Sequence, residues 1–257
     1  MNCSQKGLTR REWMQRSGVG ALGLTVLARE VLGASGGVSP NQKPIVAGVG
    51  VGGVGFPQLE ACERAGFEIG VLYGAVQPGD TVAIIGAGPI GMAALLTAQF
   101  FSPARLIMVD VDDSRLAMAK TFGATDVINS ASTDAVAGLM AMTKDGIDVV
   151  IEAVGIAATF DICQSVVRPG GHIANIGVHG TSVDLQLQDL WIKNITLTTG
   201  LVNTNTTDML MKNVQSGKLK PAELITHRFP FADFMRAYEV FANASKEKAL
   251  KVIIDNS

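Results

Sequence analysis

The stretch Val82-Ala83-Ile84-Ile85-Gly86-Ala87-Gly88-Pro89-Ile90-Gly91 decides the fold of this chain. Its first four residues form a short apolar run, which is typical of a buried parallel strand. The next six match the pattern GxGxxG, and strong helix formers follow in residues 92–100. The sequence therefore predicts a strand, a glycine turn and a helix in direct succession.

Each glycine of this turn has a different structural role. In a Rossmann-type unit, Gly86 allows the tight turn, Gly88 lets the backbone approach a pyrophosphate, and Gly91 lets helix and strand pack closely. The first helical residues add free N–H groups and a partial positive charge. We therefore expect the pyrophosphate of NAD to bind at Gly86, Gly88, Pro89, Ile90 and Gly91.

An acidic residue follows the next predicted strand. The apolar run at 106–109 ends in Asp110, about twenty residues past the glycine turn, where an acid binds the ribose hydroxyls. A carboxylate there would repel a 2′-phosphate, which favours NAD over NADP. The alternative is that Asp110 caps the following helix, although Asp112 and Asp113 could also fill that role.

Strands and helices alternate through the rest of the chain, so we expect one doubly wound α/β domain from about residue 75 onward. Ligands of such a sheet bind at the carboxyl ends of its strands. The Pro169-Gly170-Gly171 stretch is interpreted as a helix stop. Further strands are expected at 126–129, 147–152, 172–177, 195–199 and 249–254, and helices at 114–122, 134–143, 157–167, 206–216 and 232–242.

Composition argues against several other classes. The 257 residues carry a net charge of −2 and only 5% aromatic residues, so no basic face or stacking platform for nucleic acid is expected. The three cysteines and three histidines form no CxxC or HxH pattern, so the residues predict no metal site. No apolar run is long enough for a transmembrane helix.

The first 65 residues differ in character from the rest. Residues 1–36 resemble a twin-arginine export signal, with Arg10-Arg11 before a short apolar run; the alternative is an amphipathic surface helix. Residues 37–44 are interpreted as a linker, and residues 45–65 as an orphan strand, glycine turn and helix. Export to the periplasm is expected if the signal is genuine, and a cytoplasmic location otherwise.

Residues 66–254 closely resemble the cofactor-binding half of the zinc-type, medium-chain alcohol dehydrogenases, so we assign residues 66–257 to an NAD-binding domain. The resemblance implies hydride transfer between NAD and an alcohol or carbonyl substrate. It also implies that Val154 and Gly155 approach the adenosine side of the cofactor and that Gly177 and Val178 lie near the nicotinamide. Sheet packing is the alternative for Gly177 and Val178. The resemblance rests on 76–82, 86–91, 119–125, 148–155, 168–171 and 248–253.

One part of the family pattern has no counterpart here. The family's GroES-like catalytic domain supplies the zinc ligands and proton relay, whereas residues 1–65 contain no histidine and instead resemble the start of a glucose–fructose oxidoreductase-like protein. The two resemblances join near residues 65–66. We therefore expect an alcohol dehydrogenase-type oxidoreductase, impaired because that domain is missing. The alternative is a non-catalytic dinucleotide-binding module or a truncated or fused fragment.

The remaining predictions concern single residues and assembly. No catalytic residue is assigned, although His179 could act as a general acid or base near the nicotinamide; the favoured interpretation is a loop histidine. His172 is expected to be structural, His227 to lie at the surface, and Cys163 to be a small core residue. By family resemblance, residues 195–202 form an edge strand through which two copies could pair.

Overall fold

The computed structural model describes residues 69–200 and 206–255. The chain forms two units, 1–45 and 46–257, and all of the described residues belong to the second. The expected export signal at 1–36, the linker at 37–44, the orphan unit at 45–65 and the join near 65–66 lie outside the described residues. Residues 201 and 202 of the expected edge lie outside them as well.

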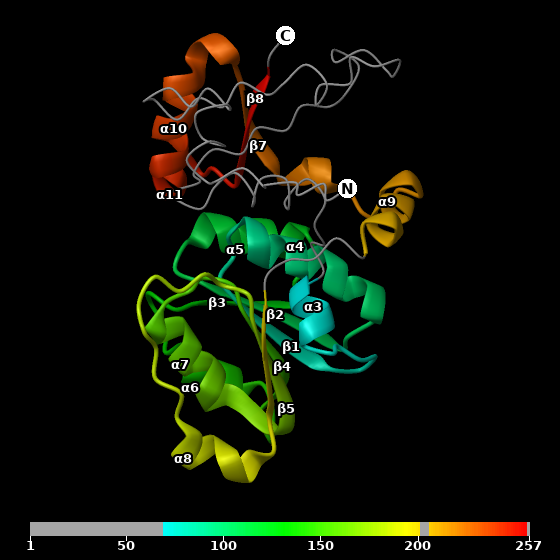
Figure 1. The fold of residues 1–257 in the computed structure, drawn as a ribbon, viewed down its shortest axis with the longest axis vertical. Coiled ribbons are helices and arrows are strands. Elements are labelled where there is room, and N and C mark those ends of the chain that lie inside the picture. Colours follow the sequence, from blue (N-terminus) through cyan, green and yellow to red (C-terminus); the bar gives the residue numbers. More distant parts are fainter. Residues whose placement is uncertain (1–68, 201–205, 256–257) are drawn as a thin grey trace, which may run out of the picture. The chain divides into compact units, whose positions relative to one another are not determined.

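A six-stranded sheet forms the centre of the described chain (Figure 1). All of its neighbouring strands pair in parallel, and their order is β3-β2-β1-β4-β5-β6. This order reverses direction between β1 and β4, as in a Rossmann fold, so the predicted α/β doubly wound sheet is confirmed. The strands are β1 (Thr81–Ile85), β2 (Arg105–Asp110), β3 (Asp126–Asn129), β4 (Ile147–Glu152), β5 (Val167–Asn175) and β6 (Thr196–Thr199).

Helices cover both faces of this sheet because successive strand residues point to opposite sides. In β1, Val82 and Ile84 pack in one core cluster, whereas Ala83 and Ile85 pack in the other. The first cluster includes residues of the helices α3, α4 and α5, and the second includes residues of α6 and α7. The two groups of helices lie on opposite sides of the sheet (Figure 1). These helices are α3 (Ile69–Tyr73), α4 (Pro89–Ala98), α5 (Asp113–Thr121), α6 (Ala135–Ala141) and α7 (Ala157–Val166).

The last expected strand does not join this sheet. It forms β8 (Lys251–Asp255), which pairs in parallel with β7 (Ile225–Pro230) in a separate two-stranded sheet. The prediction of a single doubly wound sheet through residue 254 was therefore wrong. The partner strand β7 was missed because its sequence, with His227, Arg228 and Pro230, contains no continuous apolar run. The remaining helices are α8 (Leu187–Leu190), α9 (Thr207–Gln215), α10 (Phe234–Ala242) and α11 (Ala244–Glu247), and 3-10 turns lie at η2 (Gln99–Phe101), η3 (Trp191–Lys193), η4 (Pro221–Leu224) and η5 (Phe231–Asp233).

A second correction concerns the start of β5. Pro169-Gly170-Gly171 lies inside this strand, which begins at Val167, rather than separating a helix from a strand. Its register against β4 shifts between Ile147 and Val149, and Gly170 has a φ of +72°. The irregularity at the exposed start of the strand accommodates a proline and a glycine that a regular strand would disfavour. No helix in the described part of the chain is long and apolar enough to span a bilayer.

Candidate functional site

The glycine turn lies where β1 ends and α4 begins, and its three glycines have distinct surroundings. Gly86 has a φ of +106°, and a Cβ there would lie 2.5 Å from the Val154 side chain. A Cβ on Gly91 would collide with the carbonyl oxygen of Gly86. A Cβ on Gly88 would meet nothing within 4 Å. Gly86 and Gly91 are therefore required by the fold, whereas the protein itself places no steric demand on Gly88.

Gly88 is also the N-cap of α4, and Pro89 occupies the first turn of this ten-residue helix. Gly88 supplies no side-chain cap to the N–H groups of the first turn. Those groups lack intrahelical partners and carry the positive end of the helix dipole. Ile90 is exposed beside them. The open space at Gly88 and these donors together suit an anionic group such as a pyrophosphate.

The Asp110 carboxylate lies next to this turn at the end of β2. Its Oδ2 accepts a hydrogen bond from Ala87 N at 2.6 Å, and its Oδ1 accepts one from Asp112 N at 2.9 Å. The side chain is largely buried, with 9% of the residue exposed. Each carboxylate oxygen has two lone pairs, so one acceptor position on each remains for a ligand hydroxyl. Two adjacent ribose hydroxyls match this arrangement.

The helix-cap alternative for Asp110 was wrong, because Asp112 is the N-cap of α5. The Asp112 carboxylate accepts hydrogen bonds from the backbone N–H groups of Ser114 and Arg115. Partial burial would raise the pKa of Asp112, but these bonds and those from the Ser114 and Ser245 hydroxyls outweigh it and lower the pKa to about 2. Asp110 is thereby left available for another role.

The loops that end β4 and β5 lie against each other. Gly155 has a φ of +89°, and a Cβ there would collide with the backbone of Val178. A Cβ on Gly177 would collide with Gly155 N and with the carboxylate of Glu152. Close packing thus gives Gly155 and Gly177 a structural reason to be glycine. Val154 and Val178 are 43% and 73% exposed, so a large part of each valine is not covered by the rest of the protein.

Sequence reasoning missed a buried polar cluster beneath these two loops. Glu152, at the end of β4, is fully buried, and its Oε1 accepts hydrogen bonds from Val154 N, Gly155 N and Thr159 Oγ1. Its Oε2 lies 3.6 Å from His179 Nε2, which is 2.9 Å from Asn175 Oδ1. The sequence did carry a signal, because Glu152 closes a buried apolar run just as Asp110 does.

The other singled-out side chains have structural surroundings. Cys163 is buried in α7, which confirms its assignment to the core, and burial together with the nearby Glu152 charge raises the pKa of its thiol. His172 lies within β5, as expected for a structural residue. His227 was expected at the surface, but it is partly buried in β7 and its ring stacks on Phe229. Together, these residues provide no catalytic group.

A metal ion finds no ligand set in the part of the chain described here. Residues 69–200 and 206–255 contain no cluster of three or more His, Cys, Asp or Glu side chains that could hold one. The Glu152 and His179 pair falls short of a structural or catalytic zinc site, which needs at least three protein ligands. Zinc therefore does not fit the described residues, and no chemical step is assigned to it.

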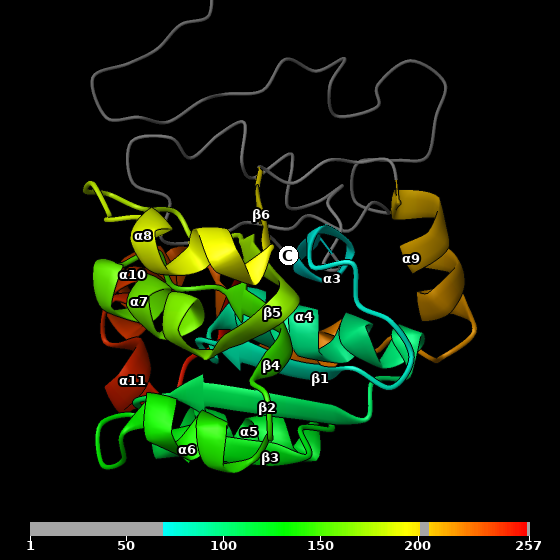
Figure 2. The same ribbon diagram turned by 90° about the horizontal axis from the view of Figure 1, so that it is seen from below.

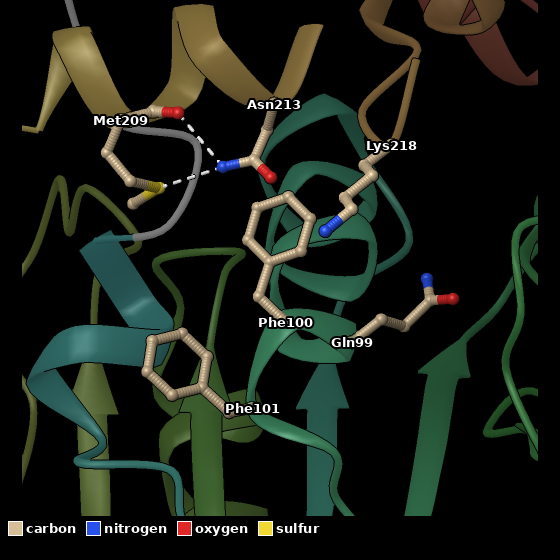
Figure 3. Close-up of a pocket in the computed structure, with 6 residues that line it drawn as sticks. All are labelled: Gln99, Phe100, Phe101, Met209, Asn213 and Lys218. Atoms are coloured by element: carbon tan, nitrogen blue, oxygen red, sulfur yellow. Dashed lines mark hydrogen bonds between the residues drawn. The ribbon is translucent and has the colours of Figure 1, made fainter. Parts of the chain in front are cut away.

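A hollow of about 470 Å³ lies at the opposite end of α4 from the glycine turn (Figure 3). Phe100 and Phe101 from η2, Asn213 from α9 and the nearby Lys218 are among its lining residues. Since α4 is ten residues long, this hollow is about 15 Å along the helix from Gly88. It is therefore separate from the candidate cofactor site.

Exposed apolar residues lie in the segment that leads into β6. β6 pairs only with β5 among the described strands and ends the six-stranded sheet, as Figure 2 illustrates. Trp191 and Ile192, in the turn just before β6, are 71% and 67% exposed, and Leu187 of α8 is also exposed. Such an edge is open to pairing with another strand.

Comparisons with known proteins identify families and proteins to which this chain is similar. Residues 89–216 match the family model described as zinc-binding dehydrogenase. An alcohol dehydrogenase from Cupriavidus necator is 32% identical over 184 residues, which is 70% of this chain and 50% of that protein. An L-idonate 5-dehydrogenase from Vitis vinifera is 31% identical over 204 residues, which is 77% of this chain and 53% of that protein.

Solved structures give the same result. A zinc-dependent alcohol dehydrogenase 2 from Streptococcus pneumonia matches with a TM-score of 0.72 and 51% identity, covering 78% of this chain and 59% of that one. An alcohol dehydrogenase from Thermus sp. ATN1 matches with a TM-score of 0.71 and 33% identity, covering 77% of this chain and 57% of that one. The chain thus spans about half the length of the curated relatives that it matches. The described residues are therefore similar to the matching part of zinc-type alcohol dehydrogenases.

Proposed function

We propose that this chain, as a relative of the zinc-type alcohol dehydrogenases, binds NAD at the carboxyl ends of β1, β2, β4 and β5. In this proposal the N-terminus of α4, with Gly86, Gly88, Pro89, Ile90 and Gly91, binds the pyrophosphate. The observation that carries the proposal is the open space at Gly88, next to free helical N–H groups and the Asp110 carboxylate. No other glycine of the turn is sterically free in this way.

Asp110 sets the preference for NAD over NADP in this proposal. Its two oxygens each keep an acceptor position after binding Ala87 N and Asp112 N, which suits the two hydroxyls of the adenosine ribose. A 2′-phosphate would face a largely buried carboxylate. Because desolvation strengthens repulsion between like charges, NADP should bind more weakly than NAD.

The loops after β4 and β5 complete the proposed cofactor site. Val154 and Gly155 approach the adenosine side of NAD, and Gly177 and Val178 lie near the nicotinamide. The exposed side chains of Val154 and Val178 support this assignment, because they offer apolar surface that is not used in the protein core. Most of the lining of a cofactor site is apolar in the same way.

The reaction proposed for the whole protein is hydride transfer between NAD and a small alcohol or carbonyl compound. Bound NAD would supply the hydride acceptor, and the residues of this chain bind and orient it. The curated relatives include alcohol and polyol dehydrogenases, which supports this class of substrate. A second candidate is a dinucleotide-binding module without turnover, which the open space at Gly88 and the Asp110 carboxylate would support equally.

The cofactor site is tested by NAD binding to the full chain, measured by calorimetry. We expect saturable binding by the wild type and at least a hundredfold loss in Gly88→Asp, which places a carboxylate against the pyrophosphate. Gly79→Asp places the same charge at another open glycine, before β1, and should bind NAD as the wild type does. Because Gly79 has a φ of +91°, thermal unfolding checks that this variant is folded. Unchanged affinity in Gly88→Asp would contradict the placement of the site.

Turnover separates the two functional candidates. NAD and a panel of secondary alcohols, with and without zinc, should give absorbance of the reduced cofactor if the chain is an oxidoreductase. Calorimetric binding of NAD without any turnover would instead favour the binding module.

Two further parts of the proposal concern assembly and location. The edge of β6, with Trp191 and Ile192 exposed beside it, is proposed to pair with the same edge of a second copy. Light scattering should then give the mass of a dimer, and a monomer would contradict it.

The resemblance of residues 1–36 to a twin-arginine signal supports export to the periplasm rather than a cytoplasmic location. Replacement of Arg10 and Arg11 by Lys should then abolish export.

A further inference from the structure

Glu152 is a fully buried carboxylate whose two oxygens have different surroundings. Oε1 accepts three hydrogen bonds, from Val154 N at 3.0 Å, Gly155 N at 2.8 Å and Thr159 Oγ1 at 2.7 Å. These bonds tie the loop after β4 to the first turn of α7. Oε2 has no hydrogen-bond partner among the described residues, although it is buried. A buried anion with one unpaired oxygen is costly unless a positive or donating group faces it.

His179 is the group that faces this oxygen. Its Nε2 lies 3.6 Å from Glu152 Oε2 and 2.9 Å from Asn175 Oδ1, so it is placed between two acceptors. The Asn175 amide is oriented for this contact, because its Nδ2 donates to the Gly177 carbonyl oxygen. Two acceptors around one ring nitrogen require that Nε2 carry the hydrogen. This N–H donates to Asn175 Oδ1, and its partial positive charge lies near Glu152 Oε2 without a hydrogen bond to it.

These contacts connect the two loops that the proposed NAD site uses. Glu152 binds the loop after β4 directly, and through His179 it faces the loop after β5. Gly177 has no side chain at the point where the Glu152 carboxylate fills the space between the loops. Val178 stands between Gly177 and His179 with its side chain in solvent. The position of Val178 is thus fixed from both sides by the buried cluster.

We infer that Glu152 is a positioning residue for the cofactor, acting through its pairing with His179. The pair holds the loops after β4 and β5 at a fixed separation, so that Val154 and Val178 contact NAD without reorganisation. Holding ligand-contacting groups in place in advance lowers the entropic cost of binding. This inference rests on the proposed NAD site, and neither Glu152 nor His179 needs to touch the cofactor.

Asp148 provides a matched comparison on the same strand. It lies at the start of β4, where it accepts a hydrogen bond from Thr81 N at 2.8 Å and pairs with Arg168. Its role is confined to the end of the sheet opposite the two loops. Removing its charge should lower stability without changing the geometry of the candidate cofactor site.

The test is a double-mutant cycle on the full chain, read by NAD calorimetry and by thermal unfolding. Glu152→Gln must either give up bonds to the β4 loop or turn an N–H donor toward His179, and His179→Gln removes the ring while keeping an amide. We expect each single variant to weaken NAD binding about tenfold and the double variant to be no more than about threefold weaker than either single one. Asp148→Asn should bind NAD within about twofold of the wild type, even where its thermal midpoint falls.

Each result has a distinct meaning. Absence of NAD binding by the wild type would remove the proposed function itself. If the wild type binds NAD but Glu152→Gln binds equally well, the positioning role is wrong, and additive losses in the double variant would exclude pairing with His179. His179 is partly exposed, so His179→Gln keeps the test decisive if Glu152→Gln does not fold. Wild-type affinity in His179→Gln would then overturn the inference.

Discussion

Carboxylates at the two ends of the six-stranded sheet have different kinds of partner. At the amino ends of the strands, Asp148 pairs with Arg168, and Asp126 pairs with Arg105. At the carboxyl ends, Asp110 and Glu152 are more deeply buried and bind backbone N–H groups, and in the described part of the chain no arginine or lysine pairs with either of them. At the amino end each carboxylate has an arginine partner, whereas at the carboxyl end backbone N–H groups bind Asp110 and Glu152, and His179 faces Glu152.

The difference distinguishes carboxylates that stabilise the fold from carboxylates that are available to a ligand. An arginine partner places a cation next to Asp148 and next to Asp126, so each of these carboxylates serves a contact within the protein. Backbone N–H groups hold Asp110 in place but leave acceptor positions free. The carboxyl end of the sheet is therefore the end prepared to bind a ligand, in agreement with the general rule for open α/β sheets.

The largest effect on stability is expected from Gly91→Ala in the glycine turn, with Gly88→Ala as its control. Gly91→Ala should lower the free energy of unfolding by about 3 kcal/mol or more, because the added Cβ collides with the Gly86 carbonyl oxygen. Gly88→Ala meets no protein atom and should cost about 1 kcal/mol or less, chiefly through its N-cap position. Denaturant unfolding measures both values.

The affinity for NAD should reveal a role of Gly88 that its stability does not. Gly88→Ala, although nearly as stable as the wild type, should bind NAD about tenfold more weakly, because even a methyl group occupies space needed by the pyrophosphate. If Gly88→Ala retained full affinity while Gly91→Ala unfolded, the turn would be a purely structural feature.

A smaller effect is expected from neutralising carboxylates at the two ends of the sheet. Asp110→Asn should weaken NAD binding about tenfold and NADP binding less, so that the preference for NAD narrows. Asp126→Asn is the matched control at the amino end, where it breaks the pair with Arg105 and should leave both affinities unchanged. Calorimetric titrations with both dinucleotides give the ratio. An unchanged ratio in Asp110→Asn would remove Asp110 from the discrimination.

The sequence predicted the carboxyl end of β1 well, because its signals are local. The glycines, the helix that follows and Asp110 lie at spacings that one strand–helix–strand unit imposes, so they could be found without knowing the rest of the fold. The Glu152 and His179 pair depends on how β4 and β5 lie side by side, and no spacing along the chain reports that. The pairing of β7 with β8 was missed as well, because the sequence of a strand does not say which other strand it lies beside.

The roles of single residues also depended on contacts that the sequence does not show. From the sequence, Asp110, Asp112 and Asp113 could all cap α5. Only the hydrogen bonds that Asp112 accepts from the backbone N–H groups of Ser114 and Arg115 assign the cap to it. Gly177 fits both a packing and a cofactor role from sequence. Its contact with the Glu152 carboxylate supplies a packing reason that was invisible beforehand.

The smallest effect concerns acid stability, where Asp112 can be compared with another helix cap. The pKa of Asp112 is lowered to about 2 in the folded chain from an ordinary value of 3.8. A carboxylate with a depressed pKa stabilises the fold fully above its unfolded pKa, and this contribution is lost as the pH falls from about 4 toward 2. Asp112→Asn keeps a good N-cap but cannot titrate, so stability should decline less between pH 5 and 2 than in the wild type.

Asp134 is the control for this effect. It caps α6 through a hydrogen bond from Ala137 N, whereas Asp112 accepts bonds from Ser114, Arg115 and the Ser245 hydroxyl. Asp134→Asn makes the same substitution at another helix cap with fewer donors, so its unfolding curves are the baseline with which those of Asp112→Asn are compared. Chemical unfolding at several pH values compares the two variants. Equal slopes in both would mean that the donors around Asp112, including Ser245, do not stabilise its charged form.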